Sequence, residues 1–571
     1  MKDIAQLIAI ANGCRPAELV LKNAQVFNGF TGQFTFGDIA ISHGYIAGVG
    51  SYQGETEVDL SGKIITPGFI DGHVHLESSM VSPRQFAKAV VPAGTTTVII
   101  DPHEIANVSG CSGIEYMLAA TEGLPMNVFV MLPSCVPVSA LENAGAELTA
   151  AALAQFIHHP RVLGLGELMN YPGVLQGDVS ILDKIRLAEG KIIDGHAPGL
   201  AGKALMAYAA AGIQSDHECV TPAEAIARLE AGLHVMLREG SAAKNLLDLM
   251  PAVNPYTAHR CFFVTDDRHP GDLIHLGHIN SMVKLAVDAG YDVATVLQLA
   301  TMNAACYFGL NELGAIAPGY KADLLVFDDL VSWRPCMVWQ NGKMVAKDGK
   351  ALFEGEGSVN AAVQSSLRLG MVDPGQLRIP AHADQARVIG LIPRQIITEE
   401  LHLSVPVIQG EFIADPSQDI LKLAVFERHS NSGKVGVGLV KGFGLKSGAI
   451  ASTIAHDSHN LIAIGTCDQD ILAAVHELKR IQGGITIVDQ GKVLKSLSLP
   501  LAGLMSDQDM HVVEAELTSL KNLARKLGVY EAFDPFLTLA FLSLPVIPSL
   551  KLTDLGLVDV KQFKVVPVSV S

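Results

Sequence analysis

The sequence predicts an α/β protein built on a (β/α)8 barrel, with a small β-sandwich domain split around the barrel and an additional C-terminal α+β domain. Strand-like and helix-like stretches alternate from residue 67 to residue 314, which is the rhythm of such a barrel. Short strands separated by glycine turns lie on both sides of that region, and a third region with its own strands and helices follows. A doubly wound open sheet would give a similar alternation, so periodicity alone does not close the barrel.

The split β-sandwich domain is predicted from residues 1–66 together with residues 315–355. Period-2 alternation and turn residues mark short strands in LVLKNAQVFNG, TFGDIAISHG, YIAGVGSYQG and TEVDLSGKIIT. Similar short strands are predicted after the barrel region, in AIAPGYKADLLVFDD and MVWQNGKMV. The simplest account is that these later strands complete the domain that begins before the barrel.

The predicted barrel covers residues 67–314. Its strand-like runs are TTTVIID, MNVFVML, RVLGLGEL, KIIDGH and CFFVTDD. Helix-like stretches such as SPRQFAKAVVPAG, AGKALMAYAAAG and TPAEAIARLEAG separate them. Strands joined through helices run parallel, which is the arrangement that a barrel of this kind requires.

The C-terminal α+β domain is predicted for residues 356–571. GEGSVNAAVQSS is a plausible linker before it, and strand-like KLAVFERH, KVGVGLVKGFG, GAIASTIAH and LIAIGTC follow. The segment DQDILAAVHELKRIQGGITIVDQGKVL then reads as a helix followed by strands. No internal repeat is found.

Composition limits the function classes. The chain has 571 residues, 49% of them hydrophobic and 17% charged, which is typical of a compact protein of several domains. Its formal charge of −17 argues against nucleic acid as a partner. None of the eight cysteines forms a C-x-x-C pair, so neither a zinc knuckle nor a disulfide framework is indicated. With no signal peptide and no membrane-spanning run, we expect a soluble, cytoplasmic protein that does not bind membranes.

Metal-ligand side chains stand at five predicted strand ends, where barrel enzymes place their catalytic residues. They are His73 and His75 in DGHVH, Glu167 in LGLGE, His196 in IIDGH, His217 in IQSDH and Asp266 in FFVTDD. A single histidine at a strand end is more often a hydrogen-bonded structural residue, but five such ends are hard to reach by accident. Four imidazoles and two carboxylates can hold two divalent ions if one carboxylate bridges. The sequence therefore predicts a metal-dependent barrel.

These motifs carry a family resemblance. Three features resemble the amidohydrolase superfamily: the split β-domain, the PGFIDGHVH segment at the start of the predicted barrel and the APGYKADLLVFD segment after it. HVHLESSM, DPHEIANV, LGLGELMNYPGV, DGHAPGL, SDHE and TDDRHPGDLIHLGHIN resemble its bacterial-type adenine deaminase family over essentially the full chain. The unrelated cytidine-type zinc deaminases use P-C-x-x-C, which this chain lacks.

The resemblance implies a site. It makes His73, His75, Glu167, His196, His217 and Asp266 the metal ligands. Glu167 takes the bridging position that a carboxylated lysine fills in hydantoinase-like and dihydroorotase-like members, and the absence of lysine from LGLGEL favours the deaminase interpretation. The resemblance also implies two divalent metal ions, with Mn or Fe favoured and Zn possible, and a homo-oligomer, with a dimer favoured.

The implied reaction is hydrolytic deamination of adenine to hypoxanthine and ammonia, a purine-salvage step. A divalent metal can lower the pKa of bound water from 15.7 to about 7, which corresponds to roughly 12 kcal/mol at about 1.36 kcal/mol per unit. Asp266 is expected to accept the proton of the attacking hydroxide and to deliver it onward, a role worth about 10²–10⁴ in rate. The alternative is that Asp266 is a metal ligand and nothing more.

Neighbouring side chains are candidates for substrate binding: Glu77, His103, Glu104, Glu239, His269 and Asn280. Glu77 should face the same side as His75 if the strand continues; it could also bind a further metal or hydrogen-bond a loop. Asp267 is expected to point away from Asp266. In IAHDSHN, His456 and His459 look like a second metal motif; a capping loop over the barrel mouth and a structural hydrogen-bond network are both open.

Three rival functions remain at this point. One is another amidohydrolase acting on a cyclic amide or an N-acetyl sugar, against which Glu167 and the C-terminal domain both argue. Another is a non-catalytic metal-binding homologue, which would be expected to have lost ligands. The third is a deaminase of adenosine or guanine, which ligand identity does not separate from an adenine deaminase.

Overall fold

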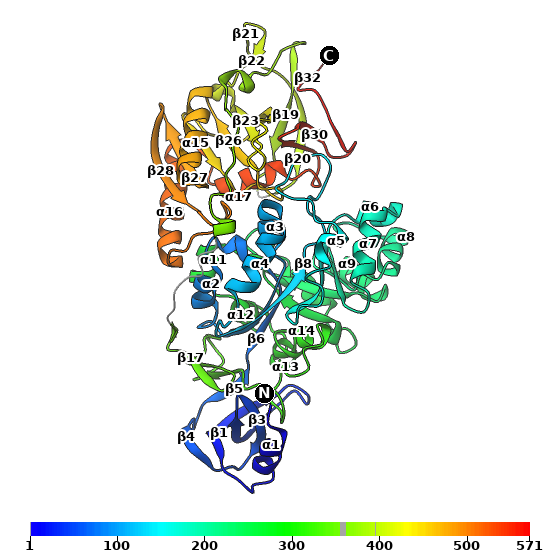
Figure 1. The fold of residues 1–571 in the computed structure, drawn as a ribbon, viewed down its shortest axis with the longest axis vertical. Coiled ribbons are helices and arrows are strands. Elements are labelled where there is room, and N and C mark those ends of the chain that lie inside the picture. The colour runs from blue at the N-terminus through cyan, green and yellow to red at the C-terminus, as the bar shows by residue number, and fades with distance from the viewer. Residues whose placement is uncertain (1, 354–360, 394, 571) are drawn as a thin grey trace.

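The computed structural model describes residues 2–353, 361–393 and 395–570. The chain forms an elongated molecule with the N-terminal sheet at one end, the barrel in the middle and the C-terminal region at the other end (Figure 1). The predicted boundary between residues 355 and 356 lies outside the described residues. No helix among the described residues is long and apolar enough to cross a membrane.

The N-terminal sheet joins segments from both sides of the barrel. Its strands are β1 (Ala17–Asn28), β2 (Gln33–Ser42), β3 (Tyr45–Gly50), β4 (Gly54–Asp59), β5 (Ile64–Pro67), β15 (Leu324–Phe327), β16 (Met337–Gln340), β17 (Lys343–Lys347) and β18 (Lys350–Ala351). β5 pairs with β15 antiparallel, with Ile65 opposite Val326. Side chains from both segments share one apolar core, including Leu21, Ile39 and Leu324. Pairing and core thus connect segments separated by the whole barrel.

The barrel strands form a closed ring, all within residues 69–267. They are β6 (Phe69–His75), β7 (Thr95–Ile100), β8 (Asn127–Leu132), β9 (Val162–Leu168), β10 (Ile192–Gly195), β11 (Ser215–Asp216), β12 (His234–Arg238), β13 (Cys261–Val264) and β14 (Asp266–Asp267). Consecutive strands pair in parallel from β6 to β10 and from β11 to β13. The Gln214 amide donates to Ile193 O at 2.9 Å between β10 and β11, and β14 pairs in parallel with β6. The ring closure confirms the barrel and excludes an open sheet.

Helices surround the barrel as the sequence predicts. They include α2 (Pro83–Val90), α3 (His103–Ser109), α4 (Cys111–Ala120), α8 (Gly202–Ala210), α9 (Pro222–Glu230), α12 (Ile279–Asp288), α13 (Val293–Leu299) and α14 (Met302–Tyr307). α9 begins at a capping box made by Thr221 and Glu224, with Pro222 at its first position, which satisfies amide groups at the helix start. The stretch DVATVLQLATMNAACYFG forms two helices, which are separated at residues 300–301.

The C-terminal region is built on a second mixed sheet. Its main strands are β19 (Gln385–Leu391), β20 (Thr398–Ser404), β23 (Ile420–Phe426), β24 (Val435–Lys441), β25 (Ala449–Ser452), β26 (Leu461–Gly465), β27 (Gly484–Asp489) and β28 (Lys492–Ser498). α15 (Asp468–Ile481) buries Ile471, Val475 and Leu478 against this sheet. α16 (Met510–Lys526) and α17 (Pro535–Ala540) follow β28.

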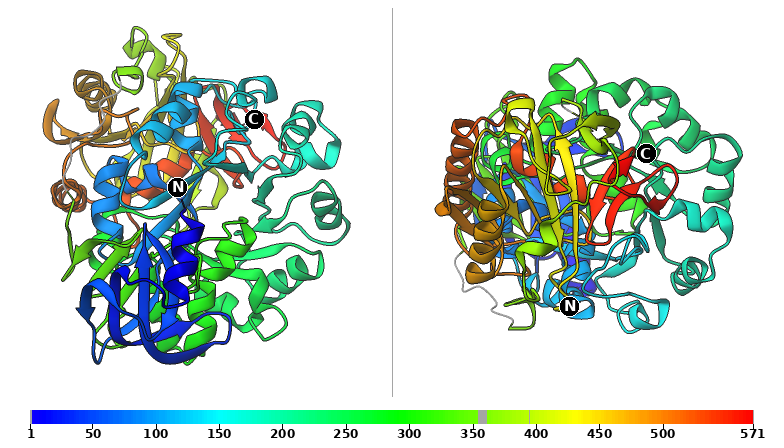
Figure 2. Two further views of the ribbon diagram at one scale, coloured as in Figure 1. Left: turned by 60° about the horizontal axis from the view of Figure 1, so that its bottom comes forward. Right: turned by 90° about the horizontal axis from the view of Figure 1, so that it is seen from above.

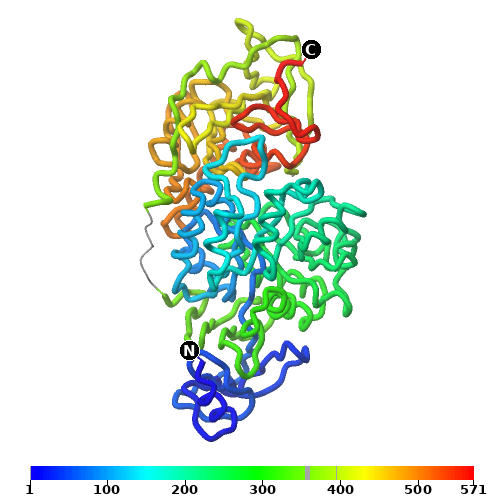
Figure 3. Tube along the Cα trace, turned by 45° about the vertical axis from the view of Figure 1, so that its right-hand side comes forward, coloured from blue at the N-terminus to red at the C-terminus, as the bar shows by residue number. Residues whose placement is uncertain are grey.

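This region covers the end of the barrel at which the parallel strands finish. In Figures 2 and 3 its yellow-to-red segments lie directly over the blue and cyan part of the barrel. Ser82 and Ser506 join the two regions through backbone hydrogen bonds, in which the Ser82 amide donates to Ser506 O at 2.7 Å and the Ser506 amide donates to Met80 O at 2.8 Å. The C-terminal region therefore lies over the loops in which a barrel enzyme carries its site.

Candidate metal centre

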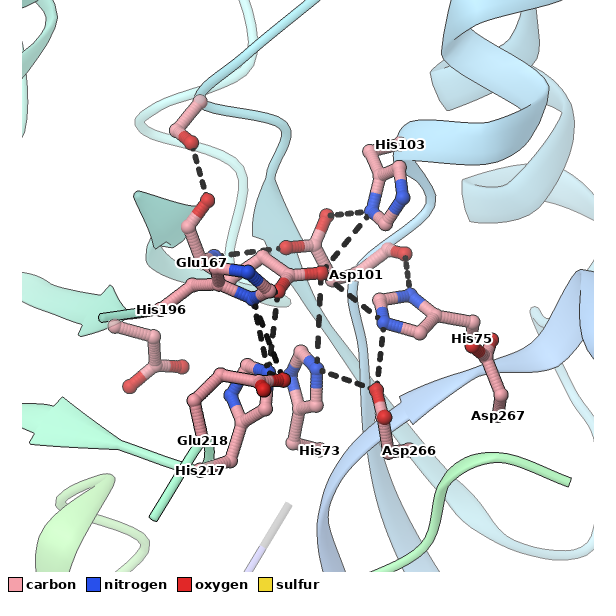
Figure 4. A network of polar contacts seen from close by, with 12 residues as sticks. His73, His75, Asp101, His103, Glu167, His196, His217, Glu218, Asp266 and Asp267 are labelled. Carbon is pink, nitrogen blue, oxygen red and sulfur yellow. Dashed lines mark hydrogen bonds and ion pairs between the residues drawn. The ribbon is translucent and has the colours of Figure 1, made fainter. Parts of the chain in front are cut away.

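The barrel brings the six predicted ligand side chains together at one end (Figure 4). His73 and His75 come from the end of β6, Glu167 from β9 and Asp266 from β14, and His196 and His217 directly follow β10 and β11. Five of the six are buried, and His196 is partly buried. Residues far apart in the chain therefore form one buried polar cluster.

Glu167 lies between two pairs of imidazoles. Its Oε1 lies 3.1 Å from His75 Nε2 and 3.9 Å from His73 Nε2. Its Oε2 lies 2.7 Å from His196 Nδ1 and 3.2 Å from His217 Nε2. Each carboxylate oxygen thus faces a different histidine pair, which is the arrangement that a carboxylate bridging two cations requires.

Asp266 faces the first of these pairs. Its Oδ1 lies 3.1 Å from His75 Nε2 and 3.4 Å from His73 Nε2, while Arg238 Nη1 donates to its Oδ2 at 3.0 Å. The backbone φ of Asp266 is +57°, a region that aspartate tolerates better than most residues and that often marks a functional site. One oxygen is therefore held by arginine and the other is directed into the cluster.

Asp101 orients two of the candidate ligands. His75 Nδ1 lies 3.0 Å from Asp101 O, to which it donates its proton, so that the lone pair of Nε2 faces the cluster. The Glu167 amide donates to Asp101 Oδ2 at 2.9 Å. A Cβ atom at Gly166 would lie only 2.0 Å from that same oxygen. The glycine before Glu167 in LGLGE is therefore required by the close approach of Asp101.

The donor set fits two divalent cations. Neither ring nitrogen of His73 has a hydrogen-bond partner among the described residues, and His217 Nδ1 also lacks one. Buried polar atoms without partners are costly, and a cation between these nitrogens and carboxylates would satisfy the His73 atom that faces it. His73, His75 and Asp266 form one group with ligand atoms within 4.8 Å of one another, and His73, Glu167 and His217 form a second.

The carboxylates of the cluster are ionised. Burial raises the pKa of Glu167, but the adjacent imidazoles of His196, His217 and His75 outweigh it and hold the pKa well below its usual range. Burial likewise raises the pKa of Asp266, whereas His73 and His75 lower it further than burial raises it. Both residues therefore present anionic oxygens, which are the form that binds a cation.

Two residues of the cluster were not predicted from the sequence. Glu218 Oε1 lies 3.3 Å from His217 Nε2 and 3.6 Å from His196 Nδ1, and Arg238 donates to both Glu218 and Asp266. Burial raises the pKa of Glu218, but Arg238 and then His196 hold it far below its usual range. Arg238 ends β12, so the strand-end rule applied to MLREGS could have found it.

β6 does not continue through Glu77, so the condition under which Glu77 is expected to face the same side as His75 is not met. The strand ends at His75, and a 3₁₀ helix, η1 (Leu76–Ser79), follows. Glu77 is nevertheless buried beside the site, where its Oε1 accepts the Ile105 amide at 3.1 Å. Burial and then the neighbouring Glu104 raise the pKa of Glu77 to about 8.

The other candidate side chains divide into two places. His103 Nδ1 lies 3.4 Å from Glu167 Oε1. Glu239 and Asn280 instead line a separate pocket with Arg268 and Lys284, where the Glu239 side chain accepts the Leu246 amide at 3.4 Å. The structure therefore brings His103, but neither Glu239 nor Asn280, to the cluster.

A cavity lies between the barrel mouth and the C-terminal region. Polar groups of the barrel form one side: Glu77, Ser78, Glu104 and His269, together with Met80. The other side is mainly apolar: Ser452, Ile454, His456, Ile485, Leu504, Phe536, Leu537 and Ala540. Glu104 follows His103 in the chain, so the cavity adjoins the histidine–carboxylate cluster.

Comparisons with known proteins identify the family. The model of the amidohydrolase family matches residues 64–355, and that of the adenine deaminase C-terminal domain matches residues 395–564. Adenine deaminase 2 of Carboxydothermus hydrogenoformans is 63% identical over 569 residues, covering 100% of each chain. The chain belongs to the adenine deaminase family. Adenine deaminases of Dehalococcoides mccartyi and Halalkalibacterium halodurans are 48% and 49% identical, covering 99% and 97% of this chain and 99% and 96% of their own. The resemblance seen in the sequence is thereby confirmed.

Proposed function

We propose that this chain hydrolyses adenine to hypoxanthine and ammonia, as a step of purine salvage. The observation that carries the proposal is the position of Glu167, whose two oxygens face two different histidine pairs beside Asp266. Full-length relatives that bear the name adenine deaminase support the choice of substrate.

The ligand set proposed for this centre is His73, His75, Glu167, His196, His217 and Asp266, with Glu167 shared between two ions. Two divalent cations bound there would supply a water of strongly lowered pKa, about 7 instead of 15.7. The absence of thiolates from the set leaves Mn, Fe and Zn as the suitable metals, and the family resemblance favours Mn or Fe.

Asp266 is the proposed acid–base residue. Its Oδ1 lies at the cluster, while Arg238 holds its Oδ2, so the free oxygen has a fixed direction. In the reaction it takes a proton from the water that attacks C6 of the purine and returns it to the ring or to the departing amino group. The oxygen of water thus replaces the amino group, which leaves as ammonia.

The purine is proposed to occupy the cavity beside the cluster. Glu77, Glu104 and His269 supply polar groups on the barrel side, and Ile454, Leu504 and Phe536 are among the apolar groups opposite. A flat base that carries both N–H donors and ring-nitrogen acceptors can use both the polar and the apolar side of such a site. His103 lies between Glu104 and the ligands, where it can orient Glu167.

Ammonia release tests the proposal. The purified holoenzyme should release ammonia from adenine with kcat/KM at least about 10²-fold higher than from adenosine or guanine, and it should leave dihydroorotate and hydantoin intact. Preferred turnover of a cyclic amide or of a nucleoside would overturn the assignment. A homodimer, which the family resemblance favours, is a separate proposal that light scattering of the purified protein decides.

A further inference from the structure

A loop of the C-terminal region, residues 453–460, reaches the barrel mouth. It connects β25 and β26 and carries the IAHDSHN motif that the proposed chemistry leaves without a role. His459 Nε2 lies 3.3 Å from Glu104 Oε2. Glu104, His456 and His459 are all buried, and one ligand-type atom of each lies within 4.8 Å of the others. The loop therefore forms a second histidine–carboxylate cluster, beside the first.

The hydrogen bond at Nδ1 of His459 shows which form of the other ring nitrogen, Nε2, faces Glu104. The Ala455 amide donates to His459 Nδ1 at 3.3 Å, so Nδ1 is an acceptor and the ring proton resides on Nε2. A metal at Nε2 would need the lone pair there, which is absent in this tautomer. The Nε2 side of His459 thus faces Glu104 Oε2 across 3.3 Å, although this contact does not form a hydrogen bond among the described residues.

His459 is held rigidly. Its backbone carbonyl accepts a hydrogen bond from Arg428 Nε, and Arg428 Nη2 donates to Ala502 O at 3.0 Å. His429 Nε2 lies 2.8 Å from Ser458 O and donates to it. The φ of His459 is +52°, a strained value that survives only where the surroundings enforce it. A backbone held in this way keeps the His459 side chain directed at one partner.

Both oxygens of Glu104 are occupied. Oε2 faces His459, and Oε1 lies 3.0 Å from Ser78 Oγ, which also lies 2.6 Å from Asp267 Oδ1. A serine hydroxyl has one proton to donate, so Ser78 donates to one of these two carboxyls at a time. The position of the Glu104 carboxyl at the cavity wall is therefore set from both sides.

His456 lies on the cavity wall itself. Its ring stacks on Phe541 with centroids 4.7 Å apart and planes inclined by 23°, and it lines the cavity together with Glu77 and Glu104. Packing on Phe541 fixes the plane of the ring at the cavity wall. An imidazole edge can donate to or accept from a purine nitrogen.

We propose that the C-terminal region forms one wall of the purine site, in which His459 is a positioning residue for the Glu104 carboxyl and His456 contacts the aminopurine base. This inference rests on the proposed function. It gives the IAHDSHN motif a role in substrate recognition, and it makes the site incomplete without the C-terminal region.

Three full-length variants test it: His459→Leu, His459→Gln and His456→Phe. Gln keeps an N–H group that can reach Glu104, Leu removes it, and Phe at position 456 keeps the stack on Phe541 while removing both ring nitrogens. The exposed His476 on α15 supplies a matched control as His476→Gln. Each protein is assayed for kcat and KM with adenine, for metal content and for thermal unfolding.

We expect His459→Leu and His456→Phe to raise KM about 10–100-fold, the effect of a lost polar contact to a charged or buried group. Both should retain two metal ions per chain, with kcat changing less than KM. His459→Gln should recover part of the loss, and His476→Gln should match the parent. If His459→Leu does not fold, His459→Gln and His456→Phe still decide the outcome.

An unchanged KM in these variants would overturn the proposal and leave the deaminase function intact. A third metal ion in the parent that His459→Gln loses would also overturn it, because the second cluster would then be a metal site. Failure of the parent enzyme to deaminate adenine would instead refute the proposed function, so the two failures are distinct.

Discussion

Two buried histidine–carboxylate clusters lie side by side in this molecule, and they differ in the state of their imidazoles. In the barrel, His75 donates from Nδ1 to Asp101 O, which leaves a lone pair at Nε2. In the C-terminal loop, His459 accepts the Ala455 amide at Nδ1, which leaves a proton at Nε2. H-x-H and H-x-x-H motifs look alike in sequence. The partner of the far ring nitrogen separates a metal ligand from a hydrogen-bond donor.

The central carboxylates of the two clusters, Glu167 and Glu104, also differ in the groups that surround them. Each oxygen of Glu167 faces imidazole nitrogens that come from different strands. Each oxygen of Glu104 instead faces one group suited to hydrogen bonding, Ser78 or His459. The first arrangement suits a shared cation and the second suits recognition of a polar ligand, so substitutions in the two clusters should have different effects.

The largest effect is expected for Glu167→Gln. Replacing one anionic oxygen by an amide removes half of the proposed bridge, so metal content should fall below two ions per chain and kcat should fall by at least about 10³. Elemental analysis and ammonia release measure the two together. The exposed Glu189→Gln is the control. Two retained ions with full activity would contradict the bridging role.

Asp266→Asn is expected to have the second-largest effect. Loss of a positioned acid–base group should lower kcat by about 10²–10⁴, since Asn keeps the shape but cannot take the proton. Asp267→Asn is the matched comparison, because Asp267 Oδ1 accepts a hydrogen bond from Ser78 Oγ; its effect should fall mainly on KM. Equal losses of kcat in the two variants would show that Asp266 has no special role.

Gly166→Ala should have a smaller effect, and this effect should be confined to the barrel cluster. The added methyl group would displace the Asp101 carboxylate that accepts the Glu167 amide, and disturbance of such supporting groups lowers metal affinity by about 10–100-fold. Metal titration of the apoprotein measures it. At Gly29 a methyl group would meet the flexible Met302 thioether at 3.2 Å and Phe27 Cε1 at 3.9 Å, so Gly29→Ala is the control. Parent-like affinity in Gly166→Ala would contradict the proposed role of Asp101.

The smallest effect is expected at Glu427, next to the Arg428 and His429 pair that holds the C-terminal loop. Burial raises its pKa, but hydrogen bonds from Ser432 and Ser430 lower the pKa to about 2. Because the folded-state pKa lies below the ordinary 4.5, this stabilisation is present above pH 4.5 and is lost as pH falls towards 2. Glu427→Gln should therefore flatten the acid side of the thermal-unfolding profile, and parallel profiles for parent and variant would refute this.

The sequence predicts the barrel cluster well because strand ends bring distant residues to one place. His73, Glu167 and Asp266 are separated by whole βα units, yet parallel strands finish at the same end of the barrel. The direction in which a side chain beyond a strand end points cannot be predicted in this way. Glu239 and Asn280 lie close in the chain to strand ends or ligands but line another pocket.

The C-terminal wall was harder to predict for a related reason. The contact between Glu104 and His459 depends on how the C-terminal region lies on the barrel, and no local pattern encodes that placement. The tautomer of His459 likewise depends on the amide of Ala455, which is a backbone group with no signature in the sequence. Both features required three-dimensional coordinates.

The most direct test of the difference between the two clusters is anomalous diffraction from crystals of the full-length protein grown with Mn²⁺. We expect two peaks, one on each side of the Glu167 carboxylate, and none among Glu104, His456 and His459. A density map with no ion beside Glu167, or with one bound to His459 Nε2, would contradict the account.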